Sequence, residues 1–503
     1  MTASELRTHA DGLLIERRWR IAYGAALANA LMFLLLSLFT YLAGPTGLLA
    51  STIVAGIFFA GSLACYFLFV RAGMDLGAVS YYVLGTGIFF GFGALVAVLF
   101  GNPQFQTFFS DSQQAALFAK ANLVNALSIL IVLAVAMRWT RPLARSASGE
   151  AGITRALDAA LPYRSMILVG GLALVVVTIY MSFPLPSNRV LQTLLSLIGS
   201  LGSVVIVYGA AQWFRLSMSE RLVLVTLTLL SFLYGIAGFG KTASMLPIAA
   251  FVVGLILERK SRVLLVATVL VAAISYFTVI APVCNAGRLI ARTNSQATFL
   301  ENLETARTVL GVARDILAQA SGDMASDMTT ALLGRFGIMP IQAFLIYRHD
   351  TGLPGDSLND AWQALIPRIL WPDKPIIGDV AKDVDAIYFN ADRPSLLAPS
   401  YSGEAYWNYG WLGVILVSIL LGLEVGWLTR QWNLFVAEGL RRIGVLMIST
   451  RALFAVFWVE TGIVGSYVGG FVTILVLILI TNWVVASLFP VVNPPSGKLS
   501  PAG

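Results

Sequence analysis

Long apolar segments alternate with short polar ones along most of this chain of 503 residues. A run of about 20 apolar residues is long enough to cross the hydrocarbon core of a bilayer as a helix. We count twelve such runs, centred near residues 32, 58, 90, 126, 174, 201, 230, 250, 271, 420, 451 and 477. The pattern therefore predicts an all-α fold, a polytopic membrane helix bundle with twelve transmembrane helices.

One long segment, residues 282–408, interrupts this alternation. Within it, apolar positions recur at steps of three and four residues with charged positions between them, which is the pattern of an amphipathic helix. These apolar positions are Phe299, Leu303, Ala306, Leu310, Ala313, Leu317 and Ala320. Such a helix would lie along the membrane surface or pack on the transmembrane bundle, and the pattern does not distinguish the two. The stretch 329–347 is also apolar but contains Arg335, Gly337 and Pro340, so we interpret it as a helix docked on, or dipping into, the outer face of the bundle.

The distribution of basic residues predicts the orientation of the chain. With the N-terminus in the cytoplasm, nineteen Lys and Arg residues fall in cytoplasmic segments and three fall in short outer loops. This asymmetry is the one expected from the positive-inside rule. We therefore expect both termini in the cytoplasm, one integral membrane domain over residues 1–503, and the 282–408 loop on the outer face of the membrane.

Composition excludes two broad classes of protein. Apolar residues make up 58% of the chain and charged residues 12%, whereas soluble chains carry about 25% charged residues. A water-soluble globule is therefore excluded. The net charge of +7 is explained by cytoplasmic anchoring, so nucleic-acid binding has almost no support. Two histidines and two cysteines, far apart in the sequence, do not form a metal-ligand set of recognised spacing, and we expect neither a metal nor a cofactor.

A motif of the type G-x-x-x-x-G-K-T occurs at residues 235–242. A nucleotide-binding P-loop needs a buried strand before this motif and an aqueous domain around it, whereas here it connects two apolar runs. We therefore reject a nucleotide site. The glycine-rich turn beside Lys241 is still a candidate binding site for a phosphate oxygen. The alternative is a tight turn whose lysine extends to the membrane interface.

The long loop contains cations on the side of the membrane where the topology rule disfavours them. Arg288, Arg335, Arg368 and Lys374 lie in apolar or proline-constrained contexts. A guanidinium fork can bind a diphosphate through two parallel hydrogen bonds, and prolines around Arg368 and Lys374 would hold both cations on a stiff scaffold. We predict that these four residues bind a diphosphate. Solvation, or pairing with the acidic residues of the same loop, is the alternative.

Three aromatic residues and two proton acceptors complete the candidate site. Trp371, Trp407 and Tyr401 could offer flat apolar faces to sugar rings, although aromatic residues are also common as membrane-interface anchors. Glu404 could remove a proton from an attacking hydroxyl, and His349 is the second candidate for that role. Structural pairing of Glu404 with an arginine is the competing interpretation.

Two elements of the loop form a recognisable signature. The first reads Pro-Arg-x-x-Trp-Pro-x-Lys-Pro over residues 367–375, and the second reads Gly-Glu followed by Asn-x-Gly over residues 403–410. Together they resemble the loop signature of the Wzy-type O-antigen and exopolysaccharide polymerases, the oligosaccharide repeat unit polymerase family. The matching positions are Pro367, Arg368, Trp371, Pro372, Lys374 and Pro375, then Gly403, Glu404, Asn408 and Gly410.

The resemblance implies a metal-independent glycosyltransferase of the bacterial inner membrane, with the 282–408 loop on the periplasmic face. It would join undecaprenyl-diphosphate-linked oligosaccharide repeat units into the O-antigen of lipopolysaccharide or into exopolysaccharide, with a chain-length regulator and a flippase as further partners. An O-antigen ligase-like transferase is one alternative, which a single outer histidine slightly disfavours. A transporter or flippase of lipid-linked oligosaccharide is another, but its charges would be expected near the membrane midplane between two similar halves rather than in one outer loop.

Overall fold

In the computed structural model, every regular element among the described residues is a helix. The structure describes residues 3–44, 48–72, 77–99, 103–140, 164–183, 189–258, 262–280, 297–319, 338–366, 399–438 and 462–468, with isolated residues between the later ranges. Contacts divide the chain into two compact units: unit 1 comprises residues 1–147, 322–433 and 452–472, and unit 2 comprises the remainder. The expectation of one membrane domain stays a prediction.

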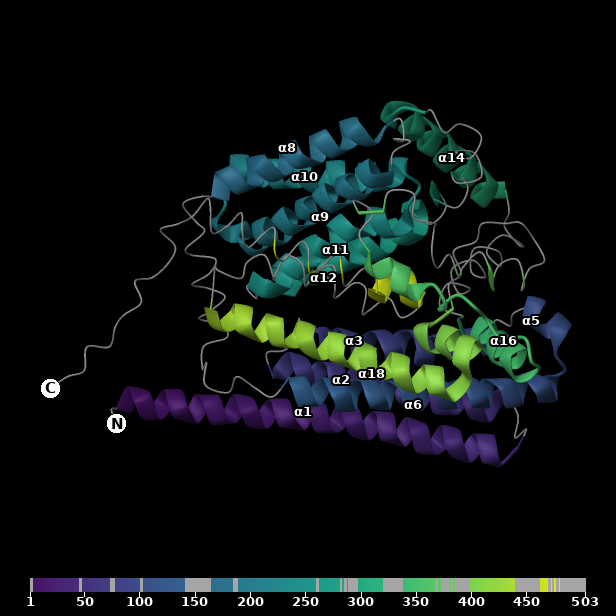
Figure 1. Ribbon diagram of the computed structural model, residues 1–503. Coiled ribbons are helices and arrows are strands. Elements are labelled where there is room, and N and C mark those ends of the chain that lie inside the picture. Colours follow the sequence, from purple (N-terminus) through teal and green to yellow (C-terminus); the bar gives the residue numbers. More distant parts are fainter. Residues whose placement is uncertain are drawn as a thin grey trace. The chain divides into compact units, whose positions relative to one another are not determined.

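Unit 1 is built from helices that come from both ends of the chain (Figure 1). Its N-terminal helices pack in one group, in which α1 contacts α2 and α6, and α2 contacts α3, η1 and α4. Their bounds are α1 Ala3–Leu42, α2 Leu48–Arg71, α3 Ala78–Thr86, η1 Gly87–Phe92, α4 Gly93–Leu99, α5 Pro103–Phe108 and α6 Asp111–Trp139. The later elements are α16 Ile338–Asp350, η5 Ala361–Leu365, α18 Tyr401–Glu438 and η7 Ile463–Val468.

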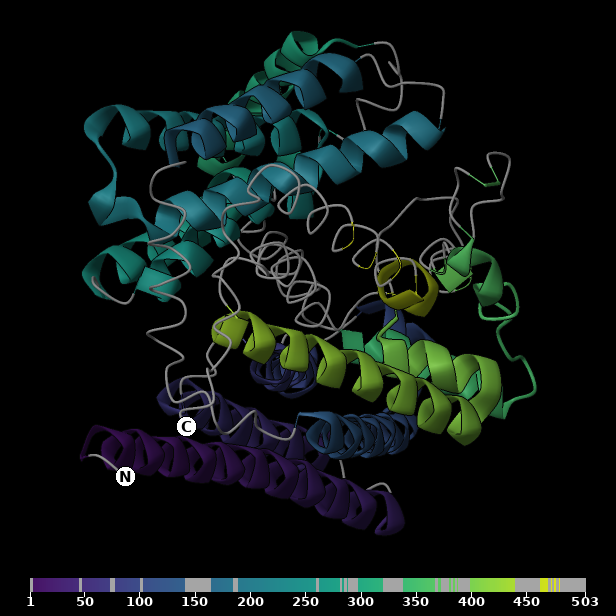
Figure 2. The same ribbon diagram turned by 60° about the vertical axis from the view of Figure 1, so that its left-hand side comes forward.

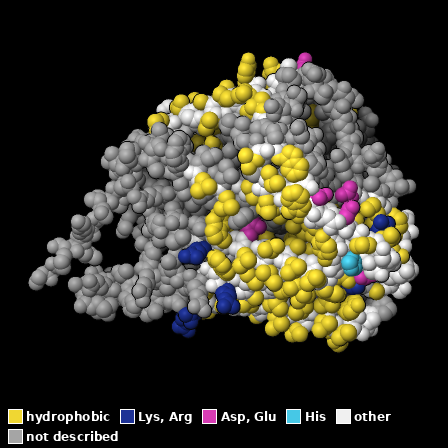
Figure 3. Space-filling view, in the orientation of Figure 1, with side chains coloured by type: hydrophobic (Ala, Val, Ile, Leu, Met, Phe, Trp, Pro, Cys, Tyr) yellow, Lys and Arg dark blue, Asp and Glu magenta, His cyan; other side chains and the backbone are white. Residues whose placement is uncertain are grey.

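The surface of unit 1 carries large apolar side chains in the pattern expected of a lipid-facing helix group. On α1, Leu35, Phe39 and Leu42 are exposed, and on α18 Leu412 and Leu420 are exposed. Figure 3 shows hydrophobic side chains over much of the described surface in view, with acidic and basic side chains in a few small groups. In water this surface would be unfavourable, whereas lipid tails cover it without cost.

Small residues bring α18 close to α6. A Cβ atom added to Gly422 would lie 2.8 Å from Val135 Cβ and 3.0 Å from the carbonyl oxygen of Val132. One turn further, a Cβ on Gly426 would lie 3.0 Å from Trp139 Cβ. Glycines four residues apart on an apolar helix allow two membrane helices to approach closely, because no side chain separates the backbones.

Unit 2 is a second helix group, in which α9 contacts α8, α10 and α11 (Figure 2, teal). The helices α11 and α12 also contact each other, and α14 packs on α10. The bounds are α8 Arg164–Ser182, α9 Arg189–Ala211, η3 Trp213–Arg215, α10 Met218–Ala237, α11 Lys241–Glu258, α12 Arg262–Ser275, η4 Tyr276–Ile280 and α14 Phe299–Gln319.

The amphipathic helix predicted in the long loop is α14. Its first turn is closed by a reciprocal cap: Thr298 N–H donates to a carboxylate oxygen of Glu301 at 2.7 Å, and Glu301 N–H donates to the Thr298 hydroxyl at 3.3 Å. These bonds, the backbone one first, lower the pKa of the Glu301 carboxyl. Its apolar face, including Leu303, Ala306 and Leu310, packs against a cluster formed by Ile236, Phe239, Ile280, Val283 and Cys284. Of the two arrangements left open by the sequence, packing on the helix bundle is therefore the one observed.

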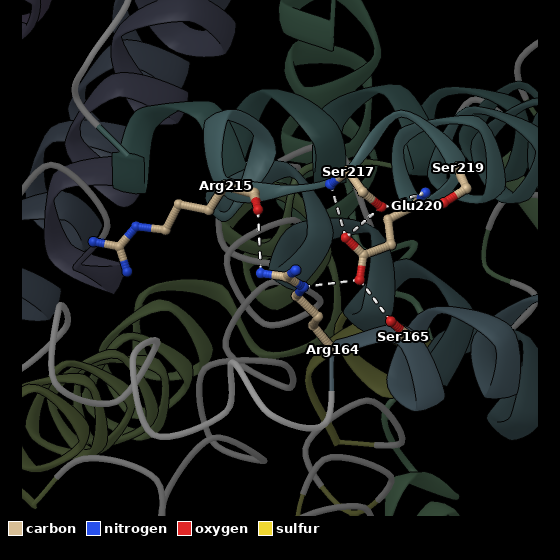
Figure 4. A network of polar contacts seen from close by, with 6 residues as sticks. All are labelled: Arg164, Ser165, Arg215, Ser217, Ser219 and Glu220. Carbon is tan, nitrogen blue, oxygen red and sulfur yellow. Dashed lines mark hydrogen bonds and ion pairs between the residues drawn. The ribbon is translucent and has the colours of Figure 1, made fainter.

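The carboxylate of Glu220 connects two helices of unit 2 through hydrogen bonds (Figure 4). Glu220, in the first turn of α10, accepts a hydrogen bond from Ser217 N–H at 2.8 Å and forms a capping box with that residue. Its other oxygen accepts from Arg164 Nε at 2.8 Å and Ser165 Oγ at 2.6 Å, and Arg164 also donates to the carbonyl oxygen of Arg215 at 3.2 Å. The start of α8 is thereby tied to the start of α10.

Seven helices in the described part of the chain are long and apolar enough to cross a membrane. They coincide with the runs predicted near residues 32, 58, 90, 126, 174, 230 and 420. Shorter apolar helices occur at Leu201–Ala211 and Ala243–Ile256, and α12 covers residue 271, while the runs near 451 and 477 lie largely outside the described residues. The chain is therefore a helical membrane protein, and the total of twelve spans stays a prediction.

Two local predictions can be compared with the structure. The described part of the 329–347 stretch is α16, which starts at Ile338 and is buried through Ile346 against α6, α4 and α5, so it is packed within the helix group. The motif at residues 235–242 begins in the last turn of α10 and ends at the start of α11. A helix precedes it where a P-loop has a strand, in agreement with the rejection of a nucleotide site.

Candidate functional site

The Gly-Glu and Asn-x-Gly element of the sequence forms the first turns of α18. A loop after α16 docks onto these turns through polar contacts. Ser357 Oγ donates to Glu404 Oε1 at 2.8 Å, Asn408 Nδ2 donates to Ser357 Oγ at 3.0 Å, and Leu358 N–H donates to Asn408 Oδ1 at 3.1 Å. Glu404 and Asn408 are therefore held by the same short segment, although they were singled out from the sequence for different reasons.

The carboxyl group of Glu404 is fully buried. Its second oxygen accepts a hydrogen bond from Ile463 N–H at 2.6 Å, at the start of η7. Both oxygens therefore have a hydrogen-bond donor. The arginine partner proposed as the competing interpretation is not found among the described residues. In this conformation Glu404 ties η7 and the 357 loop to α18, and it reaches a substrate only if one of these segments moves.

His349 lies at the last turn of α16 and is partly exposed. Its Nδ1 atom is 3.0 Å from the carbonyl oxygen of Trp407 on α18. The ring packs edge-on against Tyr406, with 5.2 Å between the ring centroids. His349 is thus held by α18, the helix that also carries Glu404, so the two proton acceptors proposed from the sequence belong to one connected group of contacts.

An ion pair lies beside this histidine. Lys120 Nζ is 2.5 Å from Asp350 Oδ2, and the Tyr406 hydroxyl donates to Asp350 Oδ1 at 3.0 Å. Lys120 also lies over the Tyr406 ring, 5.2 Å from its centroid. Lys120 is one of the three cations that we assigned to short outer loops, and it lies within α6, nine residues after Asp111, the first residue of that helix. Its partner Asp350 follows His349 directly, and we had not selected either residue.

Behind the site, polar side chains join α3, α6, α16 and α18 inside unit 1. Tyr401 shares a hydrogen bond of 2.6 Å with Tyr82 and accepts one of 3.1 Å from Ser128. Asn125 and Gln342 exchange two hydrogen bonds through their side-chain amides, at 2.7 and 3.0 Å. These groups are buried and paired, so they fix how the helices meet. Asn122, Asn125 and Ser128 recur at steps of three along α6, a signal in the sequence that would have identified a polar face on this helix but not the helices that contact it.

The three aromatic residues predicted to bind sugar lie in different environments. Tyr401 is fully buried and Trp407 is 3% exposed, and Trp407 Nε1 donates to the carbonyl oxygen of Leu353 at 3.3 Å. Both rings therefore contact protein in this conformation, as a structural role requires. Trp371 is partly exposed and lies 6.5 Å from Trp362, measured between ring centroids. Of the three, Trp371 retains a surface on which a sugar could stack.

The predicted diphosphate ligands cannot be compared with the structure. Arg288, Arg335, Arg368 and Lys374 lie outside the described residues, and so does the side chain of Lys241, the first residue of α11. One further cation is visible next to His349. Arg348 is partly exposed, and its buried Nε atom has no hydrogen-bond partner within the described part of the chain.

No group of three or more His, Cys, Asp or Glu side chains that could hold a metal occurs among the described residues. A metal-independent reaction remains a prediction from the sequence. Comparison of the chain with protein-family models, with curated proteins and with solved structures found no match.

Proposed function

We propose that this protein is a membrane glycosyltransferase that polymerises undecaprenyl-diphosphate-linked oligosaccharide repeat units into O-antigen or exopolysaccharide. The reaction takes place at the periplasmic face of a bacterial inner membrane. The donor's diphosphate is bound by the cations of the 282–408 loop, above all Arg368 and Lys374.

One observation carries the proposal. The second signature element contributes Glu404, Asn408 and Gly410 to a single cluster with His349, at the end of the helix group where α6 and α18 begin. In Figure 1, α16 and α5 lie near this end of unit 1, away from the start of α1. Under the predicted topology this is the outer face, where lipid-linked glycans are presented.

The chemistry assigned to the site is a substitution at the anomeric carbon of the donor. A hydroxyl oxygen of the incoming repeat unit forms the new glycosidic bond, and the bond from the anomeric carbon to the diphosphate breaks. Undecaprenyl diphosphate leaves with the bonding electron pair, and the hydroxyl proton passes to a protein base. Cations that bind the departing diphosphate stabilise the charge that develops in the transition state.

A transporter of lipid-linked oligosaccharide is the second candidate, because a bundle of apolar helices with a buried polar seam also suits a translocation path. An O-antigen ligase-like transferase is the third. The three differ in product: a polymerase lengthens the glycan, a ligase moves a finished chain to another lipid, and a transporter changes only the side of the membrane on which the lipid is found.

The test uses the purified full-length protein with lipid-linked repeat units and without ATP. We expect a ladder of polymers on a gel. Arg368→Ala should lower the rate about 10²–10³-fold, since it removes a preorganised charge contact. Arg368→Lys should not restore full activity, because an ammonium lacks the bidentate fork. Arg307→Ala is the matched control: this arginine of the same predicted loop is exposed and pairs with Glu304 at 3.6 Å on the surface of α14.

Two results would overturn the proposal. Movement of the lipid across vesicles without polymer formation would identify a transporter. Transfer of a preformed chain to a second lipid, with no increase in chain length, would identify a ligase-like enzyme.

A further inference from the structure

A break in α18 leaves one backbone carbonyl available to other segments. Tyr409 and Gly410 have non-helical backbone angles inside this helix (φ −133°, ψ 17° and φ 59°, ψ −144°). They lie between Trp407 and Trp411, the residue whose N–H a continuous helix would direct at the Trp407 carbonyl. This carbonyl oxygen accepts from His349 Nδ1 at 3.0 Å and from Gly355 N–H at 3.0 Å, which uses both of its lone pairs.

The contact with Trp407 determines where His349 carries its proton. A carbonyl oxygen can only accept a hydrogen bond, so Nδ1 must be the donor. A neutral imidazole has one N–H, and its other nitrogen then carries a lone pair. In the neutral ring, Nε2 is therefore the proton acceptor, and no contact within the described part of the chain engages that nitrogen.

Gly410 borders the same nitrogen. A Cβ atom on residue 410 would lie 2.8 Å from His349 Nε2. The backbone of any residue at this position must also adopt a positive φ, which is costly for every residue except glycine. Glycine therefore meets two requirements at once: it permits the turn that directs the Trp407 carbonyl to Nδ1, and it leaves Nε2 uncovered.

The other candidate base is placed differently. Both carboxylate oxygens of Glu404 are occupied by protein donors and the side chain is fully buried, whereas His349 is partly exposed with one nitrogen unengaged. We propose that the break at Gly410 is a positioning device that holds His349 as its Nδ1–H tautomer, and that His349 Nε2 is the base that accepts the acceptor hydroxyl's proton. The assignment of the base rests on the proposed function, while the tautomer does not.

Four charged or titratable groups surround His349. Tyr406 from α18 and Lys120 from α6 lie on one side with Asp350, and Arg348 precedes the histidine on α16. Lys120 and Asp350 compensate each other as an ion pair. Arg348 has no carboxylate partner within the described part of the chain.

A spectroscopic test needs no substrate. The chain has two histidines, so the variant His9→Gln labelled with ¹⁵N-histidine reports one imidazole only. At a pH where the ring is neutral, we expect the one-bond N–H coupling on Nδ1 and none on Nε2. A proton on Nε2 would overturn the tautomer assignment. Gly410→Ala should shift the population away from Nδ1–H, and an unchanged spectrum in that variant would remove Gly410 from the role of positioning residue.

The second test separates the base from the structural contact. His349→Asn retains an N–H donor near the Nδ1 position, so the contact with Trp407 and the level of folded protein should be preserved while polymerisation falls at least 100-fold. The rate that remains should lose the wild-type dependence on pH between about 5 and 8, the range in which histidine titrates. Wild-type activity and pH profile in His349→Asn would exclude His349 as the base. Absence of polymer with the wild-type protein would instead reject the proposed function and leave the tautomer result intact.

Discussion

The close approach of α18 to α6 makes a quantitative prediction about Gly422. In Gly422→Ala the new methyl carbon would lie 2.8 Å from Val135 Cβ and 3.0 Å from the Val132 carbonyl oxygen. Neither atom can turn away, because one is fixed directly to the backbone and the other is backbone. The helices must therefore separate locally, and overpacking of this kind costs about 1–3 kcal/mol.

A matched substitution removes the effect of helix propensity. Alanine is favoured over glycine within a helix by about 1 kcal/mol, which would hide part of the packing cost. Gly24 on α1 is also within a predicted span, but a Cβ there would meet no atom within 4 Å. Gly24→Ala should therefore be neutral or stabilising. The difference between the two variants isolates the packing term of about 1–3 kcal/mol.

The measurement is the free energy of unfolding of each variant in mixed micelles, from a titration with a denaturing detergent followed by circular dichroism. Gly422→Ala should unfold at a lower denaturant fraction than the wild-type protein, and Gly24→Ala should not. Equal stabilities for the two variants would show that α18 and α6 are not in close contact at Gly422.

Three further predictions follow from other parts of the molecule. Asn125→Leu should destabilise the protein by about 1–3 kcal/mol because it leaves the Gln342 amide buried without its partner, and addition of Gln342→Leu should recover part of the loss in a double-mutant cycle. Glu404→Gln should abolish long polymers while folded protein persists, because it disturbs the contacts that join η7 and the 357 loop to α18. A gel ladder measures the polymers and an immunoblot measures the protein, and an unchanged ladder would contradict the prediction. In a background lacking Cys284, single cysteines at Ser295 and Ser395, but not at Ser148, should react with a membrane-impermeant thiol reagent, and labelling at position 148 from outside would reverse the orientation.

The spacing of apolar residues in the sequence predicted the elements that depend on the residues of one helix alone. The three- and four-residue spacing of Leu303, Ala306 and Leu310 predicted α14 and its buried face, because an amphipathic stripe is a property of one helix. Runs of apolar residues located seven membrane-length helices for the same reason. Of the apolar stretch 329–347, only the residues from 338 onward lie within the described part of the chain, where they belong to α16.

The composition of the site depended on contacts that no local pattern contains. Tyr82 and Tyr401 are 319 residues apart in the sequence, and Lys120 and Asp350 are 230 apart. The signature identified Glu404 and Gly410, but it did not indicate that the first is enclosed by hydrogen bonds or that the second borders a histidine. These properties arise from the meeting of α16 with α18, and sequence reasoning had no means of pairing the two helices.

The buried polar seam of unit 1 has a consequence for how the protein is made. Ser128 on α6 bonds to Ser418 on α18 across 290 residues of sequence, and most of unit 2 is encoded between them. At about 5–20 residues per second, translation takes roughly 15–60 s to travel from one serine to the other. During that interval α6 is in the nascent chain with its Asn125 and Ser128 side chains unpaired by α16 and α18. Biogenesis of unit 1 is therefore completed from both ends of the chain, and the helices made first must wait in the insertion machinery or the lipid for the partners made last.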